Sequence, residues 1–212
     1  MTRPSKNIDR RLIEAGKALI PKTGVSGLSV RLVAKKAGVN LGMFNYHFKT
    51  KDRFIETLLF EVYEEFFKNL SVEAASGSNC KEQLENVLFQ AGRYIRDNRE
   101  IVFPFMEEII RGNKHIMAYA KKNMTAHISL ILRLVKECQR KGYIVKMSQL
   151  NVLPVFMGAV LAPVLVISVL NKFFQNGLLP GLLPMLLDKM ALSDKALKQR
   201  IEIAFKGLAP CK

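Results

Sequence analysis

The side chains best suited to chemistry are basic, and they gather at the start of the chain. Residues 1–53 hold twelve Lys or Arg against three Asp or Glu. The other 159 residues hold 21 Lys or Arg against 15 Asp or Glu. A compact excess of cations is the electrostatic footprint of a surface that meets a polyanion. A basic face that keeps the protein soluble has the same composition, so charge alone leaves both interpretations open.

Side chains that would support catalysis or metal binding are not arranged for it. The sequence lacks G-x-x-x-x-G-K-[ST], G-x-G-x-x-G, G-x-S-x-G and H-E-x-x-H. His115 and His127 are twelve residues apart, about 120° around a helix, and so are no ready ligand pair. Cys80, Cys138 and Cys211 are widely spaced without a C-x-x-C pair, which favours a reducing cytoplasm. We expect no enzyme, no metal and no cofactor.

Helices must position the basic side chains, because apolar residues recur at three- and four-residue spacing along most of the chain. The expected fold is all-α, with a small N-terminal domain over 1–53 and a larger helical domain over 54–212. The expected helices cover 7–20, 30–36, 41–47, a long stretch from 51, 81–97, 100–112, 115–141, 148–174 and 194–208. We expect a loop or helix end over 71–79 and a connector over 176–184.

Start and stop signals divide the N-terminal domain into short helices. Pro21 and Gly24 are expected to end the first helix. Ser29, Asn40 and Thr50 are placed to cap the second, third and fourth helices, since short polar side chains accept hydrogen bonds from free backbone N–H groups.

The segment Ser29–Lys51, SVRLVAKKAGVNLGMFNYHFKTK, predicts a helix-turn-helix unit. Gly38 can take the positive φ that a tight turn between two helices demands, and Ala34 is small where the helices cross. Apolar side chains such as Val33 and Phe44 would fix the crossing angle. Such a unit offers its second helix to the DNA major groove.

Residues 8–54 resemble the N-terminal domain of the tetracycline-repressor (TetR) family of regulators. The features that carry the resemblance are Gly24, Ala34, Ala37–Gly38–Val39, Asn45–Tyr46–His47–Phe48 and Lys51. The chain departs from the family pattern at Met43, where Thr or Ser is usual, and at Asn45, where Tyr is usual. These departures affect the expected base preference rather than the docking mode, because Met43 cannot donate to a phosphate but can contact a thymine methyl.

The resemblance and the side-chain types together give a set of expected DNA contacts. Arg31, Lys49 and Lys51 are candidate phosphate contacts. His47 is open between a phosphate contact and a structural role, and Phe44 and Phe48 are expected in the core. The expected DNA-binding residues are Arg31, Leu41, Gly42, Met43, Asn45, Tyr46, His47, Lys49 and Lys51.

For the rest of the chain, the resemblance implies a helical domain that binds an inducer and dimerises through its last two long helices. The expected protein is a homodimeric repressor that binds a palindromic operator on double-stranded DNA and is released by a small, largely apolar inducer. An activator, or a regulator without inducer, fits the sequence equally. Candidate inducer contacts are flexible or aromatic apolar residues, namely Phe103, Phe105, Met106, Met117, Met124, Phe156 and Met157.

Two apolar segments predict the dimer interface. Residues 148–174 are nearly all apolar, and the last helix carries one apolar stripe, formed by Leu197, Ile201, Ala204, Phe205 and Leu208. The uncharged run 152–170 also reaches the length of a membrane span. It contains Pro154 and Pro163 and stands alone, so we expect it to be buried in protein, either within the chain or against a second copy, and expect no membrane partner.

Overall fold

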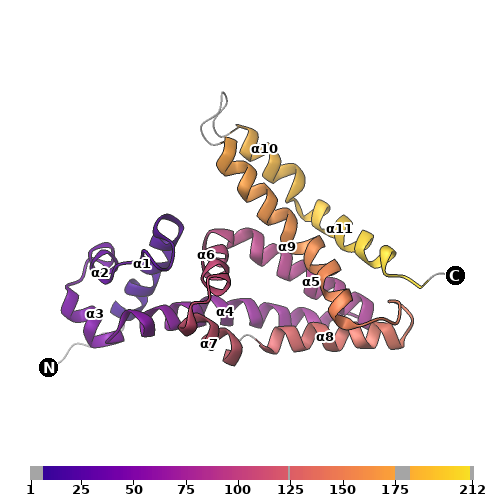
Figure 1. Cartoon of the computed structure of the whole chain (residues 1–212), viewed down its shortest axis with the longest axis horizontal. Helices are drawn as coiled ribbons and strands as arrows, with labels where there is room; N and C mark the ends of the chain where they lie inside the picture. The colour runs from indigo at the N-terminus through magenta and orange to yellow at the C-terminus, as the bar shows by residue number, and fades with distance from the viewer. Residues whose placement is uncertain (1–6, 124, 175–181, 211–212) are drawn as a thin grey trace. The chain divides into compact units, whose positions relative to one another are not determined.

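The computed structural model describes residues 7–123, 125–174 and 182–210, and within these ranges every regular element is an α-helix (Figure 1). The chain divides into two compact units, the first of residues 1–65 and 100–125, the second of residues 66–99 and 126–212. The expected all-α fold is confirmed. The expected boundary at residue 53 differs from this division, because residues 51–65 and a later segment, 100–125, belong with the N-terminal helices.

The first unit places three short helices against the start of a long one. Its elements are α1 (Ile8–Thr23), α2 (Val30–Ala37), α3 (Leu41–Phe48), the first part of α4 (Lys51–Ser76), α6 (Arg99–Ile110) and α7 (Lys114–Asn123). The rings of Phe44, Phe48 and Phe54 lie with centroids 5.0–5.5 Å apart. A Cβ on Gly16 of α1 would lie 2.7 Å from side-chain atoms of Phe54 and Leu58 of α4. Glycine therefore lets α1 approach α4 closely enough to close this core.

The predicted caps are present. The side chain of Ser29 accepts from the Leu32 N–H, that of Asn40 from the Met43 N–H, and that of Thr50 from the Arg53 N–H. Gly24 follows α1 with φ 65°, as a stop signal should, but Pro21 lies inside the helix rather than ending it. Proline has a helical φ and removes only one backbone donor, so the last turn of α1 tolerates it.

The second unit is a helical core of the second part of α4 with α5 (Cys80–Asp97), α8 (Thr125–Arg140), α9 (Gln149–Phe174), α10 (Leu182–Ala191) and α11 (Asp194–Gly207). α5, α9 and α11 pack against one another, and α10 lies beside α9 (Figure 1). The rings of Phe156 from α9 and Phe205 from α11 meet with centroids 5.0 Å apart, and both are buried. This pair lies in a continuous apolar core that includes Leu84 of α5 and Val135 of α8.

The apolar stripe on the last helix is not a free surface. Leu197, Ile201, Ala204, Phe205 and Leu208 all belong to the core of the second unit. The expectation that this stripe forms a dimer interface was wrong, because α5 and α9 of the same chain already cover it. Amphipathic periodicity shows which face of a helix is buried, but not what buries it.

α9 keeps a second apolar face outside the core. Val155, Leu165, Val166, Val169 and Phe173 are 41–78% exposed, although Val152 and Val160 are fully buried. Among the described helices, α9 is the one long and apolar enough to cross a membrane by composition, and 28% of its most apolar window is buried within the chain. The helix is therefore apolar all round but covered by its own chain on one side.

Some helix limits differ from those expected. α4 runs on to Ser76, through part of the expected loop over 71–79. α7 and α8 flank residue 124, which lies outside the described residues, so the single helix expected over 115–141 is described in two parts. α10 was missed, because Pro and Gly around 177–184 favoured a connector. Most of that connector lies outside the described residues.

Candidate nucleic-acid interface

A left-handed turn joins α2 to α3. Gly38 has φ 64° and ψ 39°, and its N–H bonds back to the carbonyls of Ala34 and Lys35. The Val39 N–H also donates to the Ala34 carbonyl, at 3.0 Å. Only glycine adopts this conformation at little cost, so the predicted role of Gly38 is confirmed.

Arg11 holds this turn from outside. Its Nη2 donates to the Ala37 carbonyl at 2.5 Å and lies 3.4 Å from the Gly38 carbonyl, so a guanidinium from α1 caps the last carbonyls of α2. A cation at a helix C-terminus also meets the negative end of the helix dipole. The sequence does not indicate this role of Arg11, because its partner lies 26 residues away.

One face of α3 is packed and the other is open to solvent. Phe44 and Phe48 are buried, as expected. Leu41, Gly42, Asn45 and Tyr46 are exposed, and Met43 is half-buried with its N–H capped by Asn40. The open face therefore carries the residues expected to meet base edges, while the packed face fixes their direction. Contact with DNA stays a prediction for each of them.

The expected phosphate contacts differ in how free they are. Arg31 and Lys49 are exposed and form no ion pair within the described part of the chain. Lys51 is half-buried, and its Nζ donates to the Ser26 carbonyl at 2.7 Å. An ammonium has three donors, so Lys51 keeps two. We conclude that Lys51 also has a structural role that the sequence did not indicate.

Lys49 has a strained backbone. Its φ is 62° and its ψ −49°, and the Thr50 N–H bonds to the Phe48 carbonyl at 2.7 Å. This is a γ-turn with positive φ, a rare form for a residue with a Cβ. The turn places Thr50 to cap α4 directly after α3 ends. It thereby fixes the direction in which the Lys49 side chain points from the surface.

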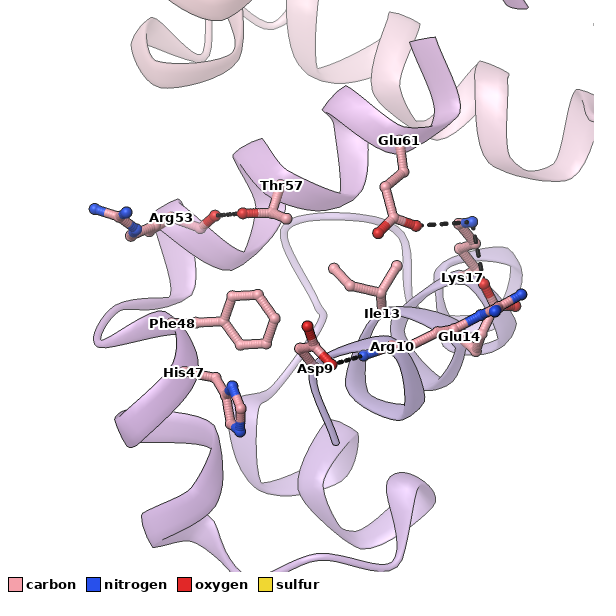
Figure 2. Close-up of a pocket in the computed structure, with 10 residues that line it drawn as sticks. All are labelled: Asp9, Arg10, Ile13, Glu14, Lys17, His47, Phe48, Arg53, Thr57 and Glu61. Carbon is pink, nitrogen blue, oxygen red and sulfur yellow. Dashed lines mark hydrogen bonds and ion pairs between the residues drawn. The ribbon is translucent and has the colours of Figure 1, made fainter. Parts of the chain in front are cut away.

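His47 lines a polar groove of about 550 Å³ (Figure 2). The groove lies between α1, the end of α3 and the start of α4, with Phe48 and Ile13 at its apolar base. The His47 Nε2 is buried and has no hydrogen-bond partner among the described residues. A buried ring nitrogen without a partner costs about 1–3 kcal/mol. A phosphate contact for His47 stays a prediction, because this nitrogen is out of reach of solvent.

The charges along this groove balance. Lys17 bridges Glu14 at 3.2 Å and Glu61 at 3.3 Å, and burial opposes but does not outweigh these carboxylates, so the pKa of Lys17 is raised. Figure 2 shows these ion pairs on one side of the groove and Arg53 pointing away on the other. Because acids and bases alternate, no single class of charged ligand is favoured here.

A buried carboxylate joins α6 to the loop between α1 and α2. Glu108 is 6% exposed and is the one charged side chain buried among the described residues. It accepts from the Ser26 hydroxyl at 2.5 Å and from the Asn113 amide at 2.8 Å. Burial raises the pKa of Glu108, but these hydrogen bonds outweigh burial and the pKa is lowered. We call Ser26, Glu108 and Asn113 the Glu108 latch.

The latch also reaches the DNA-facing residues. Ser26 donates its hydroxyl to Glu108 and accepts at its carbonyl from Lys51. A displacement of α6 would therefore be felt at the first residue of α4. The sequence does not indicate this role of Glu108, because its partner Ser26 lies 82 residues away.

The candidate inducer residues do not gather around one described cavity. Phe103, Phe105 and Met106 lie on α6 and Met117 on α7, in the first unit, whereas Phe156 and Met157 lie on α9 in the second. Phe105 and Phe156 are buried and Met117 is 45% exposed. Met124 lies outside the described residues. An inducer role stays a prediction for all of them.

The histidines and acidic residues do not form a metal site in the described residues, where no three His, Cys, Asp or Glu gather. His115 is exposed, with Nε2 3.8 Å from an oxygen of Asp52. His127 lies in the other unit beside the ring of Phe66, and burial lowers its pKa.

Comparison with known proteins relates the chain to bacterial regulators. Residues 12–58 match the family described as "Bacterial regulatory proteins, tetR family". The chain is 36% identical over 93 residues to the probable HTH-type transcriptional regulator YttP of Bacillus subtilis (strain 168), a match that covers 43% of this chain and 45% of YttP. It thus matches less than half the length of this curated relative.

Solved structures share the whole fold. A putative fatty acid metabolism regulator of Clostridium perfringens superposes with a TM-score of 0.72 at 17% identity, covering 95% of this chain and 100% of that one. The regulator FadR from Bacillus subtilis, in complex with stearoyl-CoA, gives 0.73 at 16% identity, with 93% and 98% covered. The ketosteroid regulator KstR2 of Mycobacterium tuberculosis gives 0.69 at 17% identity, with 99% and 98% covered. Identities this low establish the likeness of fold alone.

The strain at Lys49 can be measured with two substitutions. We expect Lys49→Gly to be more stable than Lys49→Ala by about 1 kcal/mol, because glycine relieves the positive φ at some cost in chain entropy. Urea unfolding at constant m-value measures the difference. The same pair at Lys36, inside α2, is the control, and there Ala should exceed Gly by about 1 kcal/mol. If the Ala variant were more stable than the Gly variant at Lys49 as well as at Lys36, the result would contradict a strained turn at Lys49.

The latch can be tested by a double-mutant cycle. We expect Ser26→Ala and Glu108→Gln to couple by about 1–2 kcal/mol in unfolding free energy, because the hydrogen bond is made to a buried carboxylate. Since the folded pKa of Glu108 is lowered, its contribution is complete above the ordinary value of 4.5 and is lost as pH falls through the folded pKa. Glu107→Gln with Ser26→Ala is the control and should show no coupling. A coupling energy of zero between Ser26→Ala and Glu108→Gln would contradict a stabilising hydrogen bond in the latch.

Proposed function

We propose that the chain is a homodimeric DNA-binding repressor of the tetR family of bacterial regulatory proteins, the family that its residues 12–58 match. It binds a palindromic operator and is released by a small, largely apolar inducer. The observation that carries this proposal is the open face of α3, held by the Gly38 turn and the Phe44 core, beside exposed and unpaired cations.

The helix-turn-helix unit of each copy, here called the head, supplies one surface that contacts base edges and a few phosphate contacts. Asn45 has an exposed amide of the kind that pairs in bidentate fashion with adenine, and Tyr46 is 75% exposed beside it. Arg31 and Lys49, both exposed, are the proposed phosphate contacts. One short helix reads only a few base pairs, so two heads related by a two-fold axis are needed for a specific operator.

The dimer is proposed to form through the outer face of α9. Val166, Val169 and Phe173 are 45–78% exposed on α9, and Met185 and Met190 are 57% and 74% exposed on the neighbouring α10. Burying such side chains contributes about 1.5–3 kcal/mol each, which favours a second copy over water. α11 would add Ile203, 65% exposed, rather than its buried stripe. The same patch on both copies gives a closed two-fold interface.

A membrane span is the competing interpretation of α9. Its buried stripe packs with α5 and α11, which carry many charged side chains on their other faces. Insertion into a bilayer would remove Phe156 and Val160 from that core and leave the amphipathic helices without a partner. Packing therefore favours a protein interface for α9.

The inducer is proposed to be small and largely apolar, and its candidate contacts are the residues predicted from the sequence. FadR, one of the similar structures, is in complex with stearoyl-CoA, and the acyl chain of that ligand supports an apolar part in the inducer proposed here. Phe103, Met106 and Met157 are half-buried, and the two methionine side chains are flexible enough to adapt to an apolar ligand. Phe156 is fully buried against Phe205 and would have to give up core packing.

DNA binding can be tested by gel shift with DNA from the gene's own neighbourhood over a salt series. We expect log K to fall by about 0.9 per phosphate contact per decade of salt. Arg31→Ala and Lys49→Ala should each weaken binding and reduce the slope by about 1 per head. Lys206→Ala on α11, paired with Glu202, is the charge-matched control. Binding that is absent, or unchanged by salt and by both head variants, would contradict the proposal.

The dimer can be tested by sedimentation. We expect wild type to sediment as a dimer and Val169→Asp to sediment as a folded monomer, because a buried, unpaired carboxylate costs several kcal/mol in each copy. Lys172→Asp, one turn away at an exposed position of α9, is the control for added negative charge. A wild-type monomer, or a protein that partitions with membranes, would contradict the proposed interface.

A further inference from the structure

Two carbonyls in the turn between α2 and α3 are left over by the backbone hydrogen bonds of the turn. The Gly38 N–H donates to the carbonyls of Ala34 and Lys35. The carbonyls of Ala37 and Gly38 accept from no backbone N–H among the described residues. The last carbonyls of a helix need a partner from outside the helix, so a side chain or water has to donate to them.

Arg11 on α1 supplies this donor. Its Nη2 lies 2.5 Å from the Ala37 oxygen and 3.4 Å from the Gly38 oxygen. The same nitrogen would lie 3.1 Å from a Cβ on Gly38, so the guanidinium rests directly against the turn. Arg11 forms no ion pair with a carboxylate in the described part of the chain. Its charge therefore faces the negative end of the α2 dipole.

The helix that carries Arg11 is anchored in the core of the first unit. Leu12, the next residue, is fully buried. Gly16, further along α1, lies against the side chains of Phe54 and Leu58 of α4. The hydrogen bonds of Arg11 therefore tie the turn to a fixed helix. Without them, two helices of eight residues would depend on apolar contacts alone, and helices this short are unstable by themselves.

The direction of α3 depends on this turn. α3 begins at Leu41, three residues after Gly38, and Asn40 is its cap. A change in the turn would therefore reorient the open face of α3, which carries Asn45. Recognition of base edges requires groups that are held within about 0.5 Å of their productive position. Phosphate contacts carry no sequence information and do not depend on the base edges.

We propose that Arg11 is a positioning residue for DNA recognition, which fixes the direction of α3 through the turn without contacting DNA itself. This inference rests on the proposed DNA-binding function. Loss of Arg11 lowers affinity for the operator, where base edges are contacted. It leaves binding to unrelated DNA unchanged, because that binding depends on phosphates.

A phosphate contact is the competing role for Arg11, because its side chain is exposed. A guanidinium has five N–H donors, and the two bonds to the turn use Nη2 alone. The two roles differ in salt dependence. Loss of a phosphate contact reduces the salt slope of log K by about 0.9 per head and weakens binding to all DNA, whereas loss of positioning does neither.

The hold of Arg11 on the turn can be tested without DNA, by amide hydrogen exchange of the full-length protein. Arg11→Met keeps most of the side-chain length but has no donor. We expect the amides of residues 38–39 and 45–48 to exchange about tenfold faster than in wild type, because a hydrogen bond from a charged donor is lost. Amides of residues 84–91 in α5 should be unchanged. Arg10→Met removes the neighbouring exposed cation and is the control, which should exchange like wild type.

Operator binding then separates the two roles, with an unrelated DNA fragment of equal length as the comparison. We expect Arg11→Met to bind the operator about tenfold more weakly, with an unchanged salt slope and unchanged binding to the unrelated fragment. Both heads of the dimer carry the substitution, so a threefold loss of correctly oriented α3 in each head gives about tenfold. Arg11→Lys should be about threefold weaker than wild type, because lysine is shorter and lacks the planar fork. Arg10→Met should bind like wild type.

Unchanged exchange at the turn and α3 in Arg11→Met would overturn the positioning role, whatever the DNA result. A reduced salt slope with weaker binding to both fragments would assign a phosphate contact instead, and an equal effect of Arg10→Met would assign a general charge effect. If Arg11→Met does not fold, Arg11→Lys takes its place, and wild-type exchange and affinity in Arg11→Lys would overturn the proposal. Faster exchange in Arg11→Met, in a protein whose wild type binds no DNA, keeps the hold of Arg11 on the turn and overturns the proposed DNA-binding function.

Discussion

The left-handed backbone at Gly38 is the constraint on which the rest of the interface depends. It turns the chain between two helices of eight residues each, which are too short to be stable alone and need tertiary packing to persist. That packing comes from Phe44 beneath α3, and the Arg11 guanidinium closes the turn from α1. The open face of α3 is rigid because its opposite face is fixed, which is what precise contact with base edges requires.

Local signals in the sequence were sufficient for this part of the molecule. Ser29, Asn40 and Thr50 cap as predicted, since a cap concerns only neighbouring residues. Phe44 and Phe48 are buried as predicted from helical periodicity. Two contacts that the sequence did not indicate are long-range. Arg11 reaches Ala37, and Ser26 reaches Glu108; a single sequence carries no record of which distant groups meet.

The apolar surfaces of the second unit also show that a sequence does not indicate which distant groups meet. The stripe on α11 and the uncharged run of α9 both predicted burial, and each has a buried side. The sequence predicted a dimer interface at both and left burial within the chain open for the uncharged run, whereas the chain itself covers the α11 stripe and one face of α9. The apolar side chains that remain exposed on α9 are those that internal packing does not cover. Only the structure shows which apolar residues of α9 these are. The proposed dimer rests on these exposed apolar side chains alone.

The energy of the Glu108 latch is suited to regulation. A hydrogen bond to a charged group contributes about 1.5–3 kcal/mol, and coupling between sites in regulated proteins is usually about 1–3 kcal/mol. A much stronger link would fix the loop between α1 and α2 whatever occupied the rest of the chain, and a much weaker one would transmit nothing. Because Glu108 is buried, water cannot replace Ser26 without a change in packing. A ligand that displaced Ser26 from Glu108 would therefore also act on Lys51, because the Ser26 carbonyl accepts from the Lys51 ammonium.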